Sequence, residues 1–523
     1  MSIFTALIVA FLAGFAYFGR RFMGDLYLER PIVLGPLVGL VMGDMGTGLL
    51  IGGTLEFIFM GAVDIGGSVP SNYAIGSAIG TAFAISTGSS VEMTLAVAIP
   101  AAMLGSFFEM FAKTIGSFFA DASEKFAEQG NTKGIAVLMH LGNLAHALSY
   151  AIPTFLALAI GTDMVKSLME SIPPWLSLGI TLTGKTLPAL GFALLLSSLA
   201  TSKLMPFFFI GFMFTAYTNF GVLGVAVLAI LVAMIIQSLR AEEEDEDFAH
   251  GAPAARESLL LKSDVKTLYW RSFAIQSAFS FDRMQAIGFT WALTPILERE
   301  YKNDKEGLAA ALKRHLAFFN TFPWIPGPIF AIVAEMEIKK ARGENIDGQA
   351  IQGVKSSLMG PIAGLGDSLI HGTLRPVLGG ICASLALTGN YAAPFIFFFG
   401  ANAVHLALRW VTLQKSCEMG ERAFGVLASS GFRKFMEGAT MTGLMSAGAL
   451  VGTWLNVRTP IQYKIDNAVV SLQTMLDGVF PKLIPLAITL TVFYFVRKGV
   501  KTTYLMLTMI AISMVLGALG ILG

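Results

Sequence analysis

Three side chains of different chemistry stand close together in the second half of the sequence, where Asp367, His371 and Arg375 fall within a nine-residue stretch. Glycine and proline residues surround them, and the sequence on both sides is apolar. A carboxylate, an imidazole and a guanidinium offer several planar hydrogen-bond donors and acceptors, which suits the hydroxyl groups of a sugar. An internal ion pair between Asp367 and Arg375 that only stabilises the fold is the alternative, and the two interpretations are compatible.

The first half carries a second candidate polar site. Glu56, Asp64 and Asn72 follow a glycine-rich run over residues 43–53, with no basic residue among them. Glycine and proline weaken helices, and irregular backbone persists at membrane depth only where protein buries it or where it lines a wet cavity. Ionisable groups at that depth are costly and usually functional. The pattern predicts broken or re-entrant helices whose ends face a bound solute; close glycine packing without a ligand is the alternative.

Composition places these sites in a membrane protein. Of 523 residues, 54% are hydrophobic and only 14% are charged, and the mean hydropathy is +0.68, whereas soluble domains carry roughly a quarter charged residues. The formal net charge of +1 does not indicate a nucleic-acid partner. Two cysteines, Cys382 and Cys417, make neither a disulfide framework nor a zinc pattern. The histidines have no metal-ligand spacing, so we expect neither a metal nor another cofactor.

A run of acidic residues divides the chain. Residues 242–247 are all Glu or Asp, and small residues follow them, which is typical of a linker. We therefore predict a membrane domain over residues 1–238, an acidic linker over 239–261 and a second membrane domain over 262–523. Charged segments with helical periodicity near 297–314, 335–355 and 415–433 predict helices partly in water, and hence a docking face for a soluble partner.

One motif is misleading. Residues 179–186 match the phosphate-binding pattern of ATPases, but that pattern requires a loop between a strand and a helix of a soluble domain. Here Pro173 and Pro188 flank the run, and apolar sequence continues beyond it. We expect no nucleotide there, and interpret Lys185 as a residue at the end of a span.

Several longer motifs resemble a known transport family. Residues 1–238 resemble enzyme IIC of the mannose-type (mannose/fructose/sorbose) phosphotransferase system, through the runs 40–44, 52–61 and 65–70. Residues 262–523 resemble enzyme IID of the same system, through Arg283-Met284-Gln285 and the runs 315–321, 359–367 and 372–376. The resemblance implies a homotrimer in the bacterial inner membrane, with IIC and IID as an inverted pseudo-symmetric pair around the sugar. It also implies that a soluble IIB protein phosphorylates the sugar, and that this chain is not catalytic alone.

The sequence departs from the family pattern at three places. IID proteins commonly have Trp-Asn-Tyr/Phe-Glu where this chain has Phe279-Ser280-Phe281-Asp282. The mannose-specific members carry an aromatic residue at the position of His371, and the usual Pro-Pro-Asp of IIC is here Pro70-Ser71-Asn72. A pocket that lacks one aromatic platform and one acid should prefer different hydroxyl or amino groups. We therefore expect an amino sugar or a substituted hexose rather than mannose or glucose.

The sequence thus predicts an all-α polytopic membrane protein with two membrane domains and broken helices. The predicted function is sugar transport: a hexose or amino sugar binds between the IIC and IID halves and is presented to a soluble IIA/IIB phosphocarrier. The substrate-binding residues that we predict are Glu56, Asp64, Ser68, Asn72, Gln285, Asn320, Asp367, His371 and Arg375, with Arg375 also steering the phosphoryl group. The alternatives are an ion-coupled transporter, in which Asp44, Glu56 or Asp64 binds sodium or a proton, and a receptor without transport.

Overall fold

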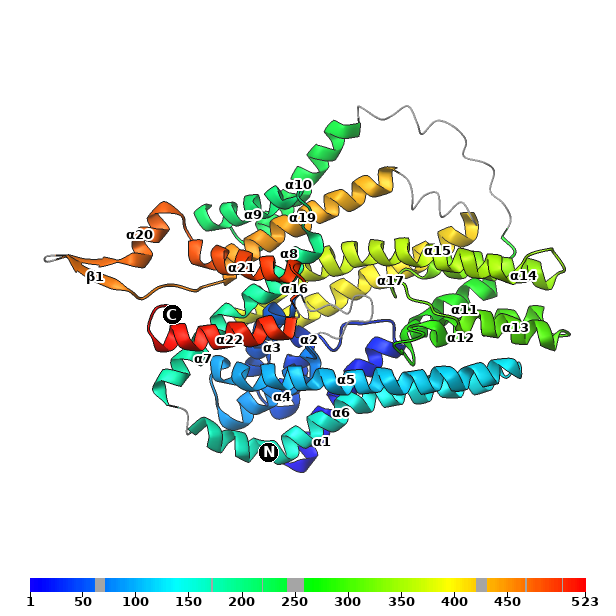
Figure 1. Ribbon diagram of the computed structural model, residues 1–523, viewed down its shortest axis with the longest axis horizontal. Coiled ribbons are helices and arrows are strands. Elements are labelled where there is room, and N and C mark those ends of the chain that lie inside the picture. The colour runs from blue at the N-terminus through cyan, green and yellow to red at the C-terminus, as the bar shows by residue number, and fades with distance from the viewer. Residues whose placement is uncertain are drawn as a thin grey trace.

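Helices dominate the chain, as the composition predicted (Figure 1). The structure is a computed structural model, and it describes residues 1–61, 71–170, 173–218, 220–241, 258–419, 430–465, 468–500 and 502–523. The helices of the first half are α1 (Ile3–Phe22), α2 (Pro31–Met42), α3 (Met45–Phe59), α4 (Tyr73–Thr87), α5 (Val91–Glu128), α6 (Thr132–Glu170), α7 (Pro174–Thr186), α8 (Pro188–Leu199), α9 (Met205–Thr218) and α10 (Val222–Ala241).

Within its described residues the second half is also helical, apart from one antiparallel hairpin. Its helices are α11 (Lys262–Ser272), the 3-10 turn η1 (Phe273–Gln276), α12 (Ala286–Glu300), α13 (Lys305–Leu316), α14 (Gly327–Ala341), α15 (Gly348–Gly366), the π-helix η2 (Asp367–Leu374), α16 (Arg375–Leu387), α17 (Ala393–Met419), α19 (Ser430–Trp454), α20 (Leu472–Val479), α21 (Leu483–Arg497) and α22 (Thr502–Ala518). The hairpin pairs β1 (Gln462–Ile465) with β2 (Ala468–Ser471).

Several helices are long and apolar enough to cross a bilayer. Within the described residues these are 3–22, 91–128, 132–161, 348–387 and 393–419, and α20 with α21 forms a sixth candidate that is bent by 75°. The stretch 348–387 is a single rod made of α15, η2 and α16, so the polar cluster around Asp367 lies inside a candidate span. The prediction of a multi-pass helical membrane protein is confirmed.

The glycine-rich run after Pro31 forms a hairpin of two short helices. At about 1.5 Å per residue, the 12 residues of α2 and the 15 of α3 are each too short for a hydrocarbon core about 30 Å thick. Gly43 makes the turn with a φ of 85°, and Asp44 caps α3 by accepting a hydrogen bond from the Thr47 amide at 2.9 Å. A Cβ on Gly35 would lie 2.7 Å from the Gly48 carbonyl oxygen, so the two backbones touch. The predicted broken element is therefore present.

The two halves of the sequence are packed into each other. α3 lies against α16, α7 against α22, and α9 against α19 (Figure 1). The last crossing depends on glycine, because a Cβ on Gly211 would lie 1.9 Å from the Met445 carbonyl oxygen and one on Gly448 would lie 2.0 Å from that of Phe208. Both hydrophobic cores contain side chains from both halves. Sites lined by the two halves together are therefore built into the fold.

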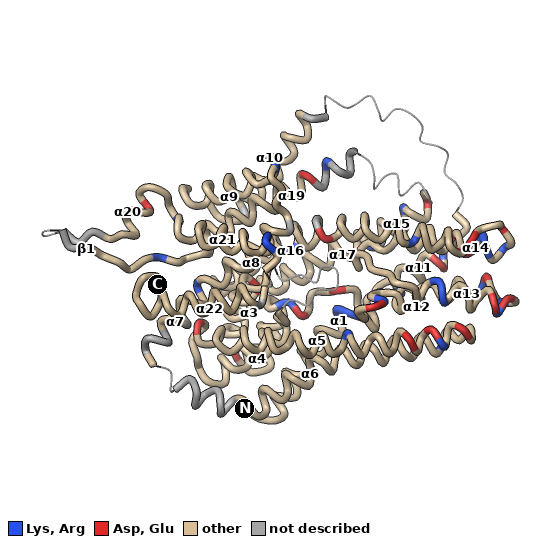
Figure 2. Tube along the Cα trace, in the orientation of Figure 1, with Lys and Arg blue, Asp and Glu red and all other residues tan. Residues whose placement is uncertain are grey.

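Charged side chains gather at one end of the molecule. Figure 2 shows acidic and basic residues over α12, α13, α14 and the C-terminal part of α5, while most of the remaining trace is uncharged. Arg283 pairs with Glu124 at 2.9 Å, and Lys313 pairs with Glu128 at 2.9 Å. Thus the first half also reaches into this end, which the sequence assigned to the second half. The predicted charged segment 415–433 is described only to residue 419 and again from 430.

The misleading nucleotide motif is helical. Residues 179–186 lie within α7, and a Cβ on Gly179 would lie 2.7 Å from the Met514 Cα, so this backbone packs against α22. A phosphate-binding loop needs free backbone amides in a turn before a helix. The helical backbone at this position agrees with the interpretation that the match is accidental.

Candidate functional site

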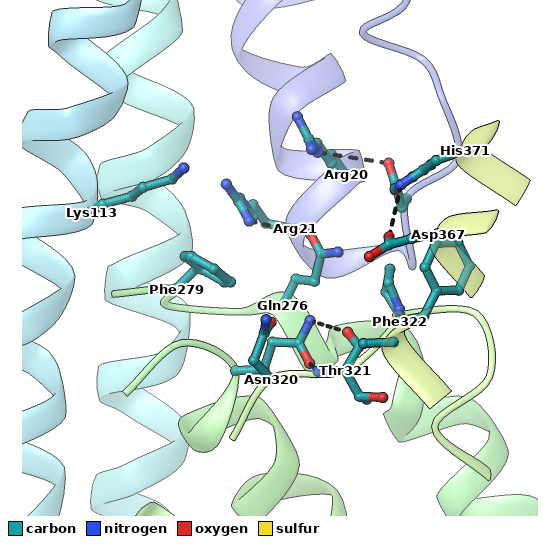
Figure 3. A pocket seen from close by; sticks show the side chains of 14 residues that line it. Arg20, Arg21, Lys113, Gln276, Phe279, Asn320, Thr321, Phe322, Asp367 and His371 are labelled. Carbon is teal, nitrogen blue, oxygen red and sulfur yellow. Dashed lines mark hydrogen bonds and ion pairs between the residues drawn. The ribbon is translucent and has the colours of Figure 1, made fainter. Parts of the chain in front are cut away.

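A narrow polar cavity lies where the two halves meet, and two of the three residues of the second-half cluster, Asp367 and His371, line it (Figure 3). It holds about 540 Å³ of space not occupied by atoms, part of which is open to the outside. Its lining residues are Arg20, Arg21, Asp25, Lys113, Gln276, Phe279, Gln285, Asn320, Thr321, Phe322, Pro323, Ala363, Asp367 and His371.

One wall of the cavity is the π-helical segment η2. Asp367 and His371 are one turn apart on it, and His371 Nδ1 lies 3.3 Å from Asp367 Oδ1. π-helical turns are rare and often occur at functional sites. Gly366 lets this wall approach its neighbour, because a Cβ there would lie 1.9 Å from Phe322 Cγ. The ring of Phe322 in turn contacts that of His371 edge-on, with 5.0 Å between ring centroids.

The adjacent wall is an extended strip around Asn320 and Thr321. Gln285 accepts a hydrogen bond from the Thr321 amide at 3.0 Å and donates one to the Thr321 carbonyl at 2.8 Å. The backbone amide of Gln285 donates a hydrogen bond to the Phe319 carbonyl at 2.8 Å. Both ends of the Gln285 side chain therefore form hydrogen bonds with the backbone of the strip. Asn320 lines the cavity beside it (Figure 3).

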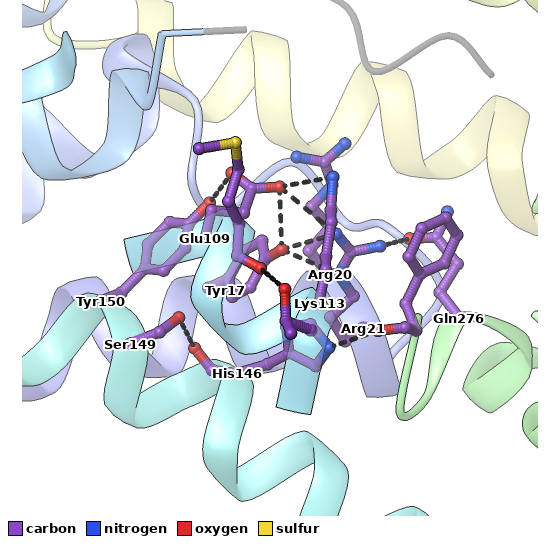
Figure 4. Close-up of polar contacts among 12 residues, drawn as sticks. Tyr17, Arg20, Arg21, Glu109, Lys113, His146, Ser149, Tyr150 and Gln276 are labelled. Carbon is purple, nitrogen blue, oxygen red and sulfur yellow. Dashed lines mark hydrogen bonds and ion pairs between the residues drawn. The ribbon is translucent and has the colours of Figure 1, made fainter. Parts of the chain in front are cut away.

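The opposite wall carries three cations from the first half: Arg20, Arg21 and Lys113. Behind them, the buried carboxylate of Glu109 lies 3.1 Å from Lys113 Nζ and 3.5 Å from Arg21 Nη2 (Figure 4). One carboxylate oxygen thus serves two cations.

Two tyrosines complete this ionic cluster. Tyr17 and Tyr150 donate hydrogen bonds to Glu109 at 3.1 and 2.9 Å, and their rings stack with centroids 3.7 Å apart. Arg21 donates to Gln276 at 3.2 Å, which connects the cluster to the second half. Hydrogen bonds from Tyr17 and Tyr150 hold the charged form of Glu109 in place inside a span.

The turn between α1 and α2 supplies an acid to the cavity. Asp25 lies 3.8 Å from Arg20 Nε, and Glu29 lies 4.0 Å from the same atom. Asp25 and Tyr27 have φ values of 70° and 61°, a conformation that residues other than glycine rarely adopt. Such backbone is retained where the surrounding structure enforces it, and it is common at functional sites.

Three of the predicted ligands lie outside the cavity lining and have structural partners. Glu56 is fully buried, bonds the Arg30 guanidinium and accepts from the Ile32 amide at the start of α2. Asn72 caps α4 by accepting from the Ile75 amide at 3.0 Å. Arg375 is buried and donates to the Met60 carbonyl at 2.9 Å. Asp64 and Ser68 lie outside the described residues.

The sequence reasoning missed the cationic wall. None of its three cations, Arg20, Arg21 and Lys113, was singled out in the sequence, and neither was Glu109. A signal was available, since Glu109 and Lys113 are oppositely charged, four apart and inside an apolar helix, where charged residues are rare. Gln276 and Thr321 could not be recognised as site residues from the sequence, because uncharged polar residues are common throughout proteins.

Comparison with known proteins assigns the two halves separately. A family model described as the PTS system mannose/fructose/sorbose family IID component matches residues 259–522, and one described as the PTS system sorbose-specific IIC component matches residues 3–235. The fructose permease IID component of Bacillus subtilis is 40% identical over 252 residues, which cover 47% of this chain and 91% of that protein. The mannose-specific EIIC component of Escherichia coli K12 is 33% identical over 237 residues, covering 45% and 87%.

A solved structure of the mannose transporter ManYZ in complex with microcin E492 is also similar. It is 34% identical in sequence and covers 51% of this chain and all of that chain, with a TM-score of 0.30.

Proposed function

Because the chain belongs to the mannose/fructose/sorbose family of phosphotransferase-system permeases and carries a IIC and a IID component in one polypeptide, we propose that its cavity binds a sugar between the two halves. The chain is a multi-pass protein of the bacterial inner membrane. In the proposed function the bound sugar is presented to a soluble IIB phosphocarrier. The cavity's composition carries this proposal, since Arg20, Arg21 and Lys113 come from the IIC part, and Asn320, Asp367 and His371 from the IID part.

The chemistry of the lining suits a carbohydrate. Asp367 accepts hydrogen bonds, while Asn320 and His371 can both donate and accept, and this is what vicinal hydroxyl groups need. The rings of Phe279 and Phe322 provide apolar surface for the carbon face of a sugar ring. His371, at a position where mannose-specific members carry an aromatic residue, supports a hexose or amino sugar of different hydroxyl pattern.

The cationic wall takes over the role that the sequence assigned to Arg375. Arg20, Arg21 and Lys113 line the cavity directly, whereas Arg375 is bonded to backbone. Cations beside the hydroxyl that receives the phosphoryl group would attract the anionic donor. The phosphorylated product is then retained, since an unpaired phosphate is very costly to transfer through lipid.

The assembly implied by the family completes the proposal. A soluble IIA/IIB protein docks at the charged end formed by α12, α13 and α14, and the permease is a homotrimer in the bilayer. Residues 1–238 act as the IIC domain, 239–261 as the linker and 262–523 as the IID domain. The chain is not an enzyme by itself, because the phosphoryl group is carried by the partner.

Uptake into membrane vesicles tests this function. We expect candidate hexoses and amino sugars to accumulate as phosphates only when phosphoenolpyruvate and the soluble donor proteins are present. Accumulation of free sugar that a protonophore abolishes would refute the proposal and favour the ion-coupled alternative. Of the acids named for that alternative, Asp44 caps α3 and Glu56 is bonded to Arg30, so the described geometry does not favour it.

A further inference from the structure

A second cavity lies outside the sugar site, in a groove between α11 and α17. It holds about 1060 Å³ of space not occupied by atoms, much of it open to the surroundings. Leu260, Val265, Trp410 and Cys417 form its apolar walls, and Lys262 and Lys266 stand at its rim. The remaining lining residues are Ser258, Gln414 and Glu418. None of these residues belongs to the sugar cavity.

Aromatic side chains place one end of this groove at the membrane surface. Tyr269 of α11 meets Trp410 of α17 edge-on, with ring centroids 5.2 Å apart. Trp270 is 68% exposed and stacks on Phe273 with 5.7 Å between ring centroids. Exposed tryptophan and tyrosine concentrate at the boundary between hydrocarbon and water. Because α17 is a candidate span, these rings place that boundary near Trp410.

The groove continues from this aromatic belt towards the charged end. Tyr269 contacts Trp410, whereas Lys262 lines the groove together with Cys417 and Glu418. The two helices therefore run in opposite directions, and both lysines lie on the aqueous side of the rings. Going from the span towards water, the groove presents an apolar wall and then two cations. A phospholipid has the same order, with its acyl chains in the hydrocarbon and its anionic headgroup on the aqueous side.

The charge balance at the rim is positive. Lys262 and Lys266 are exposed and one turn apart, and among the described residues neither forms an ion pair. The nearby acid Asp264 is bound to Arg299. Glu418 is bound to Lys415 at 2.8 Å and accepts from the Gln414 side chain at 3.1 Å. Two unpaired cations thus border an apolar groove.

We propose that this groove binds an anionic phospholipid, with the headgroup phosphate on Lys262 and Lys266, the glycerol end of an acyl chain against Val265, and the rest of that chain passing Trp410 into the hydrocarbon. The lipid fills the gap between α11 and α17 and thereby anchors the IID domain at the membrane surface. The proposal does not depend on the identity of the sugar or on the transport mechanism.

Native mass spectrometry of the purified full-length protein tests the site. We expect phosphatidylglycerol to remain bound at a stoichiometry of at least one per chain, and phosphatidylcholine to bind much more weakly. The double substitution Lys262→Gln/Lys266→Gln should weaken phosphatidylglycerol binding about thirtyfold, which corresponds to about 1 kcal/mol per lysine. Lys302→Gln/Lys305→Gln near α13 removes the same charge from another exposed site and should leave binding unchanged.

Fluorescence provides a local readout that does not depend on charge counting. Phosphatidylglycerol with brominated acyl chains should quench the Trp410 emission. This part of the quenching should be absent in Trp410→Phe and should decrease in Val265→Phe, which narrows the groove without adding a tryptophan. Phosphatidylglycerol binding that is equal in the wild type and in the lysine variant would refute the proposal. So would loss of oligomers in the lysine variant without change in lipid retention, because a second copy of the chain would then be the occupant.

Discussion

Two buried carboxylates inside the membrane domains have opposite surroundings. Glu56 faces one guanidinium, that of Arg30, and its second oxygen accepts from a helix-terminal amide. Glu109 faces two cations, and both of these, Arg21 and Lys113, line the central cavity. The first arrangement is closed and matched in charge, so it holds α2 and α3 together. The second has one more cation than acid and faces open space, which is what an anion-attracting site requires.

The comparison shows that an acid inside a membrane is not by itself a ligand. Both residues are costly to bury, and from the sequence Glu56 looked the more functional of the two. What separates them is whether their partners reach a cavity.

Removing one member of the closed pair should damage the fold most. In Arg30→Met the Glu56 carboxylate stays buried without its cation, which costs about 3–5 kcal/mol. We expect a large drop in the thermal unfolding midpoint and in the yield of folded protein in detergent. The double substitution Arg30→Met/Glu56→Leu should recover most of the loss, and a single variant as stable as the wild type would contradict a structural role.

A third ionic cluster, outside the candidate spans, extends the comparison to pH. Burial raises the pKa of Glu337, but His315 and Arg314, at 2.9 and 2.8 Å, outweigh this effect and lower the pKa to about 2. Because the unfolded value is about 4.3, the charged cluster contributes about 3 kcal/mol of stability. A lowered pKa means that this stability is present above about pH 5 and is lost as the pH falls towards 2.

The unfolding midpoint measured between pH 7 and pH 3 checks this contribution. Glu337→Gln should lower the midpoint at pH 7 and flatten its decrease in acid. Glu335→Gln, two residues away on the same helix and bonded only to Ser258 among the described residues, is the matched control and should change little. An unchanged acid profile in Glu337→Gln would show that other groups control the acid sensitivity.

Two of the Gly-Asp pairs in the sequence, Gly43-Asp44 and Gly366-Asp367, offer a matched test of binding. Asp367 lines the cavity, whereas Asp44 caps α3 and is exposed. Asp367→Asn should weaken sugar binding by about 10- to 100-fold, since one charged hydrogen bond is worth about 1.5–3 kcal/mol, without changing the unfolding midpoint. Asp44→Asn keeps the cap and should bind sugar normally. If calorimetry showed that the two variants bind sugar equally well, Asp367 would not be a sugar ligand.

The smallest effect is expected behind the cationic wall. Tyr150→Phe removes one hydrogen bond to Glu109 while keeping the ring that stacks on Tyr17. The expected cost is about 1.5 kcal/mol of stability, at the lower end for a hydrogen bond to a charged group because Glu109 keeps its other donors, and it should appear as a small decrease in the unfolding midpoint. Sugar affinity should fall little, because Arg21 and Lys113 keep their carboxylate. A larger loss of affinity than of stability would mean that Glu109 positions the cations for the ligand.

The chain's local pattern was sufficient for part of the site. Asp367 and His371 are four residues apart, and any helical conformation brings such residues together, so their pairing could be predicted from spacing. The glycines between Gly35 and Gly52 similarly predicted the α2–α3 hairpin, because only residues without a side chain allow such close backbones. Arg375 is one further turn along the same rod, yet it bonds to Met60 of the other half, which spacing could not reveal.

The sequence by itself determined the membrane class, the IIC and IID halves, the broken helices and the polar cluster that contains Asp367 and His371. These follow from composition, motif order and short-range geometry. Only the tertiary structure decided that Arg20, Arg21 and Lys113 face that pair, and that Glu56 is occupied by Arg30. The physical reason is that a buried charge pairs with an opposite charge that the packing of distant helices brings close to it. The spacing of residues along the sequence does not show which helices pack together.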